Sequence, residues 1–245
     1  MMTIRCIWEH NGPDTLLYVE DYPGAFARGE HLDVALEKIP GEVAAYRRWL
    51  GLDPQPIDTI EVVQEQTGDL QIRDADSDVI FASEKLPLSR EAYADLKALA
   101  LKSAADFQRL YDAVPDVDVG QGSGRRTFYG PVPRSAREMY EHTKNVNEYY
   151  FWEIGVDTDN LGSIAECRKR GFEKLEQMAD FLTKPATQGS YGESWSLRKV
   201  LRRFIWHDRI HAKAMYRMAV QTFGPGAVPD IFYFETERRD QNGMA

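Results

Sequence analysis

The first 85 residues contain short apolar runs separated by turn signals, a pattern typical of strands around one helix. Residues 3–8 and 15–20 are rich in β-branched, apolar and aromatic side chains, and the Asn11-Gly12-Pro13-Asp14 break between them predicts a hairpin. Apolar positions from His31 to Leu50 follow helical spacing, and Pro40 is expected to bend or split that helix. Two further strands are predicted at residues 59–64 and 78–82. We therefore expect a small α+β unit.

The pattern changes to helical periodicity after Pro87. We therefore expect a domain boundary near Leu86, with residues 1–85 in an α+β domain and residues 86–245 in an all-α domain that carries a C-terminal extension.

Four helices are predicted in the second part of the chain, over residues 89–110, 135–150, 161–182 and 194–223. Ser89 and Ser135 are suited to cap the first two, and Glu138 follows Ser135 at the spacing of a capping box. The Gly224-Pro225-Gly226 run is a stop signal for the last helix. Four helices of this length indicate a four-helix bundle.

Two long connections separate these helices, at residues 114–134 and 183–193, so at least one can cross the bundle and the order of the helices stays open. The glycine-rich run at residues 120–124 lacks the Lys-Ser/Thr ending of a phosphate-binding loop, and no predicted strand leads into it. We interpret it as a flexible linker.

The composition is that of an ordinary globular protein, with 43% hydrophobic and 28% charged residues in 245, which excludes a mainly disordered chain. A net charge of -9 argues against general nucleic-acid binding, which needs clustered basic residues. The two cysteines, Cys6 and Cys167, have no metal or redox spacing and suit a reducing compartment. Because no stretch approaches the length of an apolar membrane span, we expect a soluble cytoplasmic protein that does not enter a membrane.

Three of the five histidines are candidates for a metal site. His207 and His211 are four residues apart on the last predicted helix, which places both on one face. His142 lies on the second predicted helix, and all three fall in line with apolar positions that should face the bundle interior. Those positions are Val200, Phe204, Met215 and Met218 on one helix, and Met139, Val146 and Tyr149 on the other. A shared metal would satisfy the three imidazoles together; the alternative is that each bonds a separate carbonyl or tyrosine hydroxyl.

Two segments resemble the DinB-like family of metal-binding bundles. Residues 200–215, VLRRFIWHDRIHAKAM, resemble its last helix, and residues 135–142, SAREMYEH, resemble the helix that supplies its first histidine. The order of one histidine, about sixty residues and then HxxxH also matches. The resemblance covers about Ser89 to Phe223 and departs from the family's pattern at Ala212-Lys213, where many members have a basic residue directly after the histidine.

This resemblance implies a DinB-like bundle, usually dimeric, in which His142, His207 and His211 hold a divalent metal such as zinc or nickel. Three imidazoles leave one position where water is acidified or a thiol binds as thiolate. The implied activity is thiol transfer or hydrolysis, on a small-molecule thiol or an anionic substrate. The alternative is a stress-related or regulatory binding module with a structural metal or none. A ferritin-like diiron site is excluded, because the chain has no Glu-x-x-His pair.

If the protein is an enzyme, Glu148, Tyr149 and Tyr150 are candidates for proton handling or for hydrogen bonds to the metal ligands, because they lie one to two turns from His142. Ordinary packing or solvent exposure is the alternative for each of them.

The segment from Tyr18 to Leu36 resembles the HicB-like antitoxin domain, whose pattern is two strands, a Pro-Gly turn, a short strand ending in glycine and a helix. The match covers roughly Ile4 to Leu50 within the first domain. It implies a partly open sheet with a helix on one face. Since the chain continues into the helical part, we expect a binding or dimerising module and not toxin neutralisation.

The last helix is also basic, with Arg198, Lys199, Arg202, Arg203, Arg209, Lys213 and Arg217 against the single acid Asp208. An anionic partner is one interpretation; salt bridges to neighbouring helices and a solvated face are the other, favoured in so acidic a chain. The apolar residues 231–234 are expected either to add an edge strand or to cover the bundle.

Overall fold

A computed structural model describes residues 2–72, 76–120, 126–127 and 130–235. The chain divides into two compact units. Residues 1–79, 125–132 and 230–245 form the first unit, and residues 80–124 and 133–229 form the second. The fold combines an N-terminal sheet with C-terminal helices, as the pattern of apolar positions predicts.

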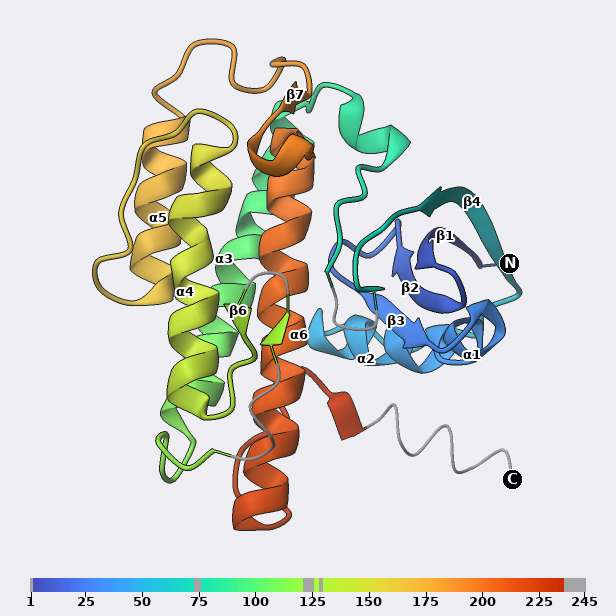
Figure 1. Ribbon diagram of the computed structural model, residues 1–245, viewed down its shortest axis with the longest axis vertical. Coiled ribbons are helices and arrows are strands. Elements are labelled where there is room, and N and C mark those ends of the chain that lie inside the picture. The colour runs from blue at the N-terminus through green and yellow to red at the C-terminus, as the bar shows by residue number, and fades with distance from the viewer. Residues whose placement is uncertain (1, 73–75, 121–125, 128–129, 236–245) are drawn as a thin grey trace. The chain divides into compact units, whose positions relative to one another are not determined.

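The first unit is built on a four-stranded sheet in the order β3-β2-β1-β4 (Figure 1). Its strands are β1 (Thr3–Asn11), β2 (Asp14–Val19), β3 (Phe26–Gly29) and β4 (Thr59–Thr67). β1 and β2 form the predicted antiparallel hairpin, and β4 runs parallel to β1. Parallel pairing requires a crossover, which the helical segment between β3 and β4 supplies.

The helical segment of the first unit is split at Pro40, as predicted. α1 (Leu32–Leu36) ends before it, and α2 (Ile39–Trp49) begins with the proline in its first turn, where a missing N–H costs no hydrogen bond. Gly29 allows α1 to follow β3 closely, because a Cβ at this position would lie 2.6 Å from the carbonyl oxygen of His31.

The prediction of a strand at residues 78–82 is wrong. These residues form no strand, and the 3-10 helix η2 (Ala82–Lys85) begins where the strand was expected to end. The physical reason lies in Glu9, whose buried carboxylate accepts hydrogen bonds from the backbone N–H groups of Asp78 (2.9 Å) and Val79 (3.1 Å) and from the hydroxyl of Ser77 (2.6 Å). Backbone donors that bond a side chain are not free for a strand ladder.

The C-terminal residues of the described chain neither add an edge strand nor belong to the helical unit. Phe232 is buried in the first unit, where its ring lies 5.4 Å from that of Trp49 on α2. The edge strand predicted as one alternative for residues 231–234 is therefore wrong. Four apolar residues carry too little pattern to select the surface that they cover.

The second unit is built on four helices that pack side by side (Figure 1). They are α3 (Arg90–Asp112), α4 (Ala136–Trp152), α5 (Ile164–Leu175) and α6 (Leu197–Phe223). The side chain of Ser89 accepts the N–H of Ala92, and Ser135 and Glu138 form the predicted capping box. None of the helices in the described part of the chain is long and apolar enough to cross a membrane.

Two of the predicted helices are too long. α5 begins after a second capping box, Ser163 with Glu166, and ends at Leu175 instead of Leu182. α6 begins at Leu197 instead of Ser194, because β8 (Ser194–Trp195) pairs with β7 (Thr187–Gln188). The connection before α6 is thus a structured hairpin. Of the glycine-rich run at residues 120–124, all but Gly120 lies outside the described residues.

A single buried arginine links all four helices of the second unit. Arg168 on α5 is fully buried and forms an ion pair with Asp208 on α6. The same guanidinium donates to the side-chain oxygen of Asn147 on α4 (3.0 Å) and to the carbonyl oxygen of Ala100 on α3 (3.1 Å). Its Cζ atom lies 4.3 Å from the ring centre of Phe204. All charged and polar groups of this pair are therefore satisfied inside an apolar core.

We expect Arg168→Met to destabilise the protein by about 3–5 kcal/mol, because Asp208 would stay buried without its partner. Urea unfolding measures the effect. Arg170→Met on the same helix is the matched control, since Arg170 pairs with Asp159 at the surface and such pairs contribute about 0–1 kcal/mol. Equal losses in the two variants would contradict the role given to the buried pair.

Candidate metal centre

The three predicted histidines converge in the second unit. His142 comes from α4, and His207 and His211 come from successive turns of α6. The ring centre of His142 lies 5.1 Å from that of His207 and 4.7 Å from that of His211. The ring centres of His207 and His211 are 4.5 Å apart. One nitrogen from each ring lies within 4.8 Å of the others. Tetrahedral zinc ligands at their usual bond lengths are about 3.4 Å apart, so small ring rotations would bring the three nitrogens to one ion.

The surroundings of the imidazoles disfavour separate hydrogen bonds. His207 is 7% exposed, and its Nδ1 atom has no hydrogen-bond partner among the described residues. Among the described residues, neither His142 nor His211 hydrogen-bonds a carbonyl or a tyrosine hydroxyl. A buried nitrogen without a partner costs about 1–3 kcal/mol, which a bound ion would remove.

Burial keeps all three histidines neutral. It is the largest cause that lowers the pKa of His142, lowers that of His211 to about 3, and holds that of His207 well below its ordinary value. The charges of Arg203 and Arg168, and of His211 and His142 whenever either is protonated, lower the pKa of His207 further. The neutral imidazole is the form that binds a metal, so the cluster is ready to do so at neutral pH.

The three residues proposed for proton handling lie in different surroundings. Tyr150 is buried, its ring centre is 6.1 Å from that of His207, and burial raises its pKa. Tyr149 packs its ring 5.8 Å from Trp195. Glu148 is exposed and accepts a hydrogen bond from the Asn160 side chain at 3.0 Å. Tyr150 thus has a ring contact with His207 of the cluster.

Arg203, which in the sequence is one of several basic residues of the last helix, is a neighbour of the histidines. Its guanidinium lies over three aromatic rings, 5.5 Å from the centre of Tyr150, 5.7 Å from Trp195 and 4.9 Å from Trp206. It is one helical turn before His207, and this four-residue spacing was the available signal.

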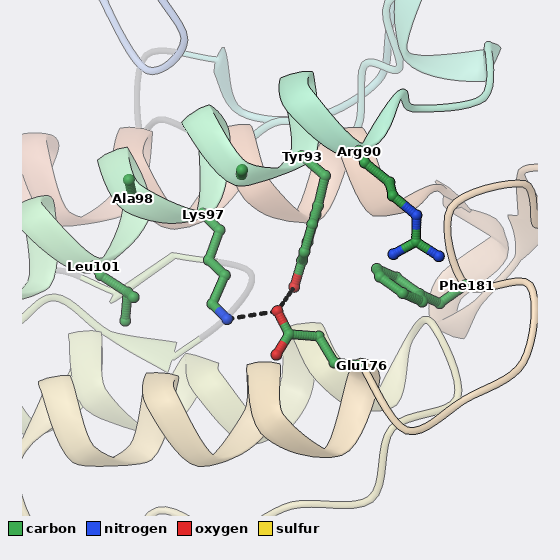
Figure 2. A pocket seen from close by; sticks show the side chains of 8 residues that line it. Arg90, Tyr93, Lys97, Ala98, Leu101, Glu176 and Phe181 are labelled. Carbon is green, nitrogen blue, oxygen red and sulfur yellow. Dashed lines mark hydrogen bonds and ion pairs between the residues drawn. The ribbon is translucent and has the colours of Figure 1, made fainter.

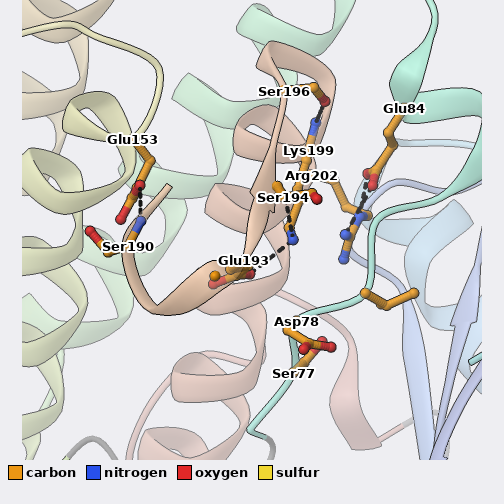
Figure 3. A network of polar contacts seen from close by, with 12 residues as sticks. Ser77, Asp78, Glu84, Glu153, Ser190, Glu193, Ser194, Ser196, Lys199 and Arg202 are labelled. Atoms are coloured by element: carbon orange, nitrogen blue, oxygen red, sulfur yellow. Dashed lines mark hydrogen bonds and ion pairs between the residues drawn. The ribbon is translucent and has the colours of Figure 1, made fainter. Parts of the chain in front are cut away.

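Other basic residues of α6 are committed to partners within the unit (Figure 3). Lys199 pairs with Glu193 at 2.9 Å and Arg202 pairs with Glu84, and all four side chains are buried. Burial lowers the pKa of Lys199 to about 8. The salt-bridge interpretation of the basic stretch therefore holds for these two residues.

A groove of about 470 Å³ lies between α3 and the end of α5 (Figure 2). Three of its polar groups satisfy one another, because the hydroxyl of Tyr93 and the ammonium of Lys97 both donate to the same oxygen of Glu176. Among the described residues, no buried polar atom of this groove is without a hydrogen-bond partner.

Comparisons with known proteins place the chain in no family: no family model matches it, and neither a curated protein nor a solved structure is similar to it.

The histidine cluster should make the metal-free protein less stable in acid. In the unfolded chain a histidine takes up a proton near pH 6.5, whereas the folded-state pKa values are lower, so the unfolded state binds more protons below about pH 6.5. Stability should therefore fall as the pH drops from about 6.5 toward about 3. We expect His207→Gln to remove about 1–2 kcal/mol of the loss between roughly pH 7 and pH 5.

Urea unfolding in the presence of a chelator measures this pH dependence. His31→Gln, at an exposed histidine of the first unit, is the control. A His207→Gln profile parallel to that of the unmodified protein would show that the cluster does not cause the acid sensitivity.

Proposed function

We propose that this protein is a metal-dependent enzyme of the DinB-like type, in which His142, His207 and His211 hold one divalent ion. The observation that carries the proposal is the convergence of three neutral imidazoles, with His142 and His211 half-buried and His207 buried with an unpartnered nitrogen. Nitrogen-only ligation suits zinc or nickel. Within the described residues no cysteine or carboxylate belongs to the same cluster, so the protein supplies three ligands and leaves a position for a substrate or for water.

The ion in such a site supplies a Lewis acid that lowers the pKa of a bound water or thiol, which supports hydrolysis or thiol transfer. The chain's own residues have separate roles. Tyr150 packs against His207 and restricts its orientation. Arg203 adds positive potential at the cluster, which favours an anionic ligand such as a thiolate over a neutral one.

We propose that the first unit is a HicB-like binding or dimerising module. The support is its hairpin, the short strand β3 that ends at Gly29, and the helix that follows at once. The close approach at Gly29 gives a physical reason for the glycine in that pattern.

The metal site is tested by elemental analysis of the untagged full-length chain after equilibration with zinc or nickel. We expect about one ion per chain. Single replacements of His142, His207 or His211 by alanine should each weaken binding by more than about 100-fold, because even outer hydrogen-bond partners of metal ligands contribute about 10–100-fold. His31→Ala is the matched control, at an exposed histidine. An unmodified protein that binds no metal would refute the proposal.

The open position is tested on cobalt-substituted protein by titration with a small thiol. A thiolate that joins the ion should produce a sulfur-to-cobalt charge-transfer band and change the ligand-field spectrum. We expect Arg203→Met to weaken thiol binding without loss of cobalt. Lys169→Met, at an exposed lysine of α5, should change neither the affinity for the thiol nor the cobalt content. A cobalt spectrum that no thiol changes would indicate a closed structural site and would refute an enzyme of this type.

A further inference from the structure

A second cavity lies in the helical unit, apart from the three histidines. Its volume is about 400 Å³, in the range of pockets that bind small molecules. The apolar part of its wall consists of Ile154, Leu175, Phe181, Pro185 and Leu197. The walls come from the end of α4, the end of α5, the segment after it and the start of α6.

Two buried polar atoms of this wall have no hydrogen-bond partner among the described residues: Oε1 of Glu153 and Nε1 of Trp195. Glu153 is 7% exposed and Trp195 is 0% exposed, so bulk water does not satisfy them. The other carboxylate oxygen of Glu153 accepts the backbone N–H of Ser190 at 2.9 Å, which fixes the side chain (Figure 3). A buried acceptor and a buried donor are thus both left unused, an arrangement that requires an explanation.

The two side chains meet at Gly189. A Cβ at this position would lie 2.0 Å from Oε2 of Glu153 and 2.5 Å from Cδ1 of Trp195, so only glycine fits between them. The indole is held from the other side by Tyr149 and Tyr150, whose ring centres are 5.8 Å and 5.4 Å away. The polar end of the cavity is therefore rigid.

Lys184 supplies the second charge of the cavity. Its ammonium lies 3.9 Å from the point where a Cβ on Gly155 would sit, and it forms no ion pair with any described residue. Glu153 and Lys184 are the two charged residues of the wall, and they do not pair with each other. The wall of the cavity thus contains one carboxylate, one ammonium, one indole N–H and apolar side chains.

We propose that this cavity binds a free α-amino acid with an apolar side chain. The ammonium of the ligand would pair with Glu153, its carboxylate with Lys184 and the indole N–H of Trp195, and its side chain would contact Leu175, Phe181 and Leu197. This zwitterion uses both unpartnered atoms and both charges at once. An apolar amine or a fatty acid would use only one charge. The site needs no metal.

Isothermal titration calorimetry on the full chain, with L-leucine and L-phenylalanine as probes, tests the proposal. We expect saturable binding of one molecule per chain. N-acetyl-leucine lacks the ammonium and leucinamide lacks the carboxylate, so each should bind at least about tenfold more weakly. No binding of either amino acid at millimolar concentration, or equal binding of leucine and its two derivatives, would overturn the proposal.

Two substitutions connect binding to the cavity. Glu153→Gln and Lys184→Met should each weaken the binding of leucine by about tenfold or more. Glu173→Gln and Lys169→Met, at exposed positions of α5, are the matched controls and should leave binding unchanged. Lys184 is exposed, so its replacement tests the site even where Glu153→Gln impairs folding. Unchanged binding in the Lys184 variant would overturn the proposal.

Repeating the titration with a chelator separates this site from the metal centre. We expect the same affinity with and without metal. Binding that disappears with the metal would mean that the amino acid ligates the ion, which would overturn the cavity as its site. Failure of the metal proposal would leave this result unaffected.

Discussion

The helical unit depends on one buried charge. Arg168 lies at its centre and bonds Asp208, Asn147 and the carbonyl of Ala100, so that α5 is joined to α6, α4 and α3 by a single guanidinium. A buried ion costs several kcal/mol unless its geometry is nearly ideal, which strongly favours the one arrangement of helices that satisfies it. Apolar packing by itself tolerates small shifts between helices, whereas this hydrogen-bond pattern does not.

The histidine cluster follows from this arrangement. Asp208 is adjacent to His207 in sequence, and Asn147 is on the same helix as His142. These two partners of Arg168 therefore come from the same two helices as the three imidazoles. The core pair sets how α4 and α6 face each other, and the imidazoles meet on that inner surface. Burial then keeps them neutral, because a protonated histidine there would be a second, uncompensated charge.

The long helix α6 carries several further buried basic residues that have partners within the helical unit. Lys199 and Arg202 are buried, and each is paired with a carboxylate from outside the helix, Glu193 and Glu84. Arg203 lies over aromatic rings. Although the sequence of α6 is typical of a basic surface helix, much of the helix is therefore buried. Net charge along a segment does not reveal whether its partners are solvent, ligands or other parts of the chain.

The sequence by itself determined the local features. Period-two and period-3.6 patterns predicted the hairpin of β1 and β2, the split at Pro40 and the beginnings of α3 and α4, because capping and turn residues act within a few positions. The in-line positions of His142, His207 and His211 also predicted that these side chains face inward and could share one ion.

Tertiary structure decided everything that depends on residues far apart in the chain. Glu9 accepts the backbone N–H groups of Asp78 and Val79, so the predicted strand does not form, and the β7–β8 hairpin delays the beginning of α6. The cavity at Glu153 and the pairing of Arg168 have no signature in sequence spacing. Their physical reason is common: a buried polar group selects its partner by distance in space, and the cost of leaving it unpaired outweighs local propensity.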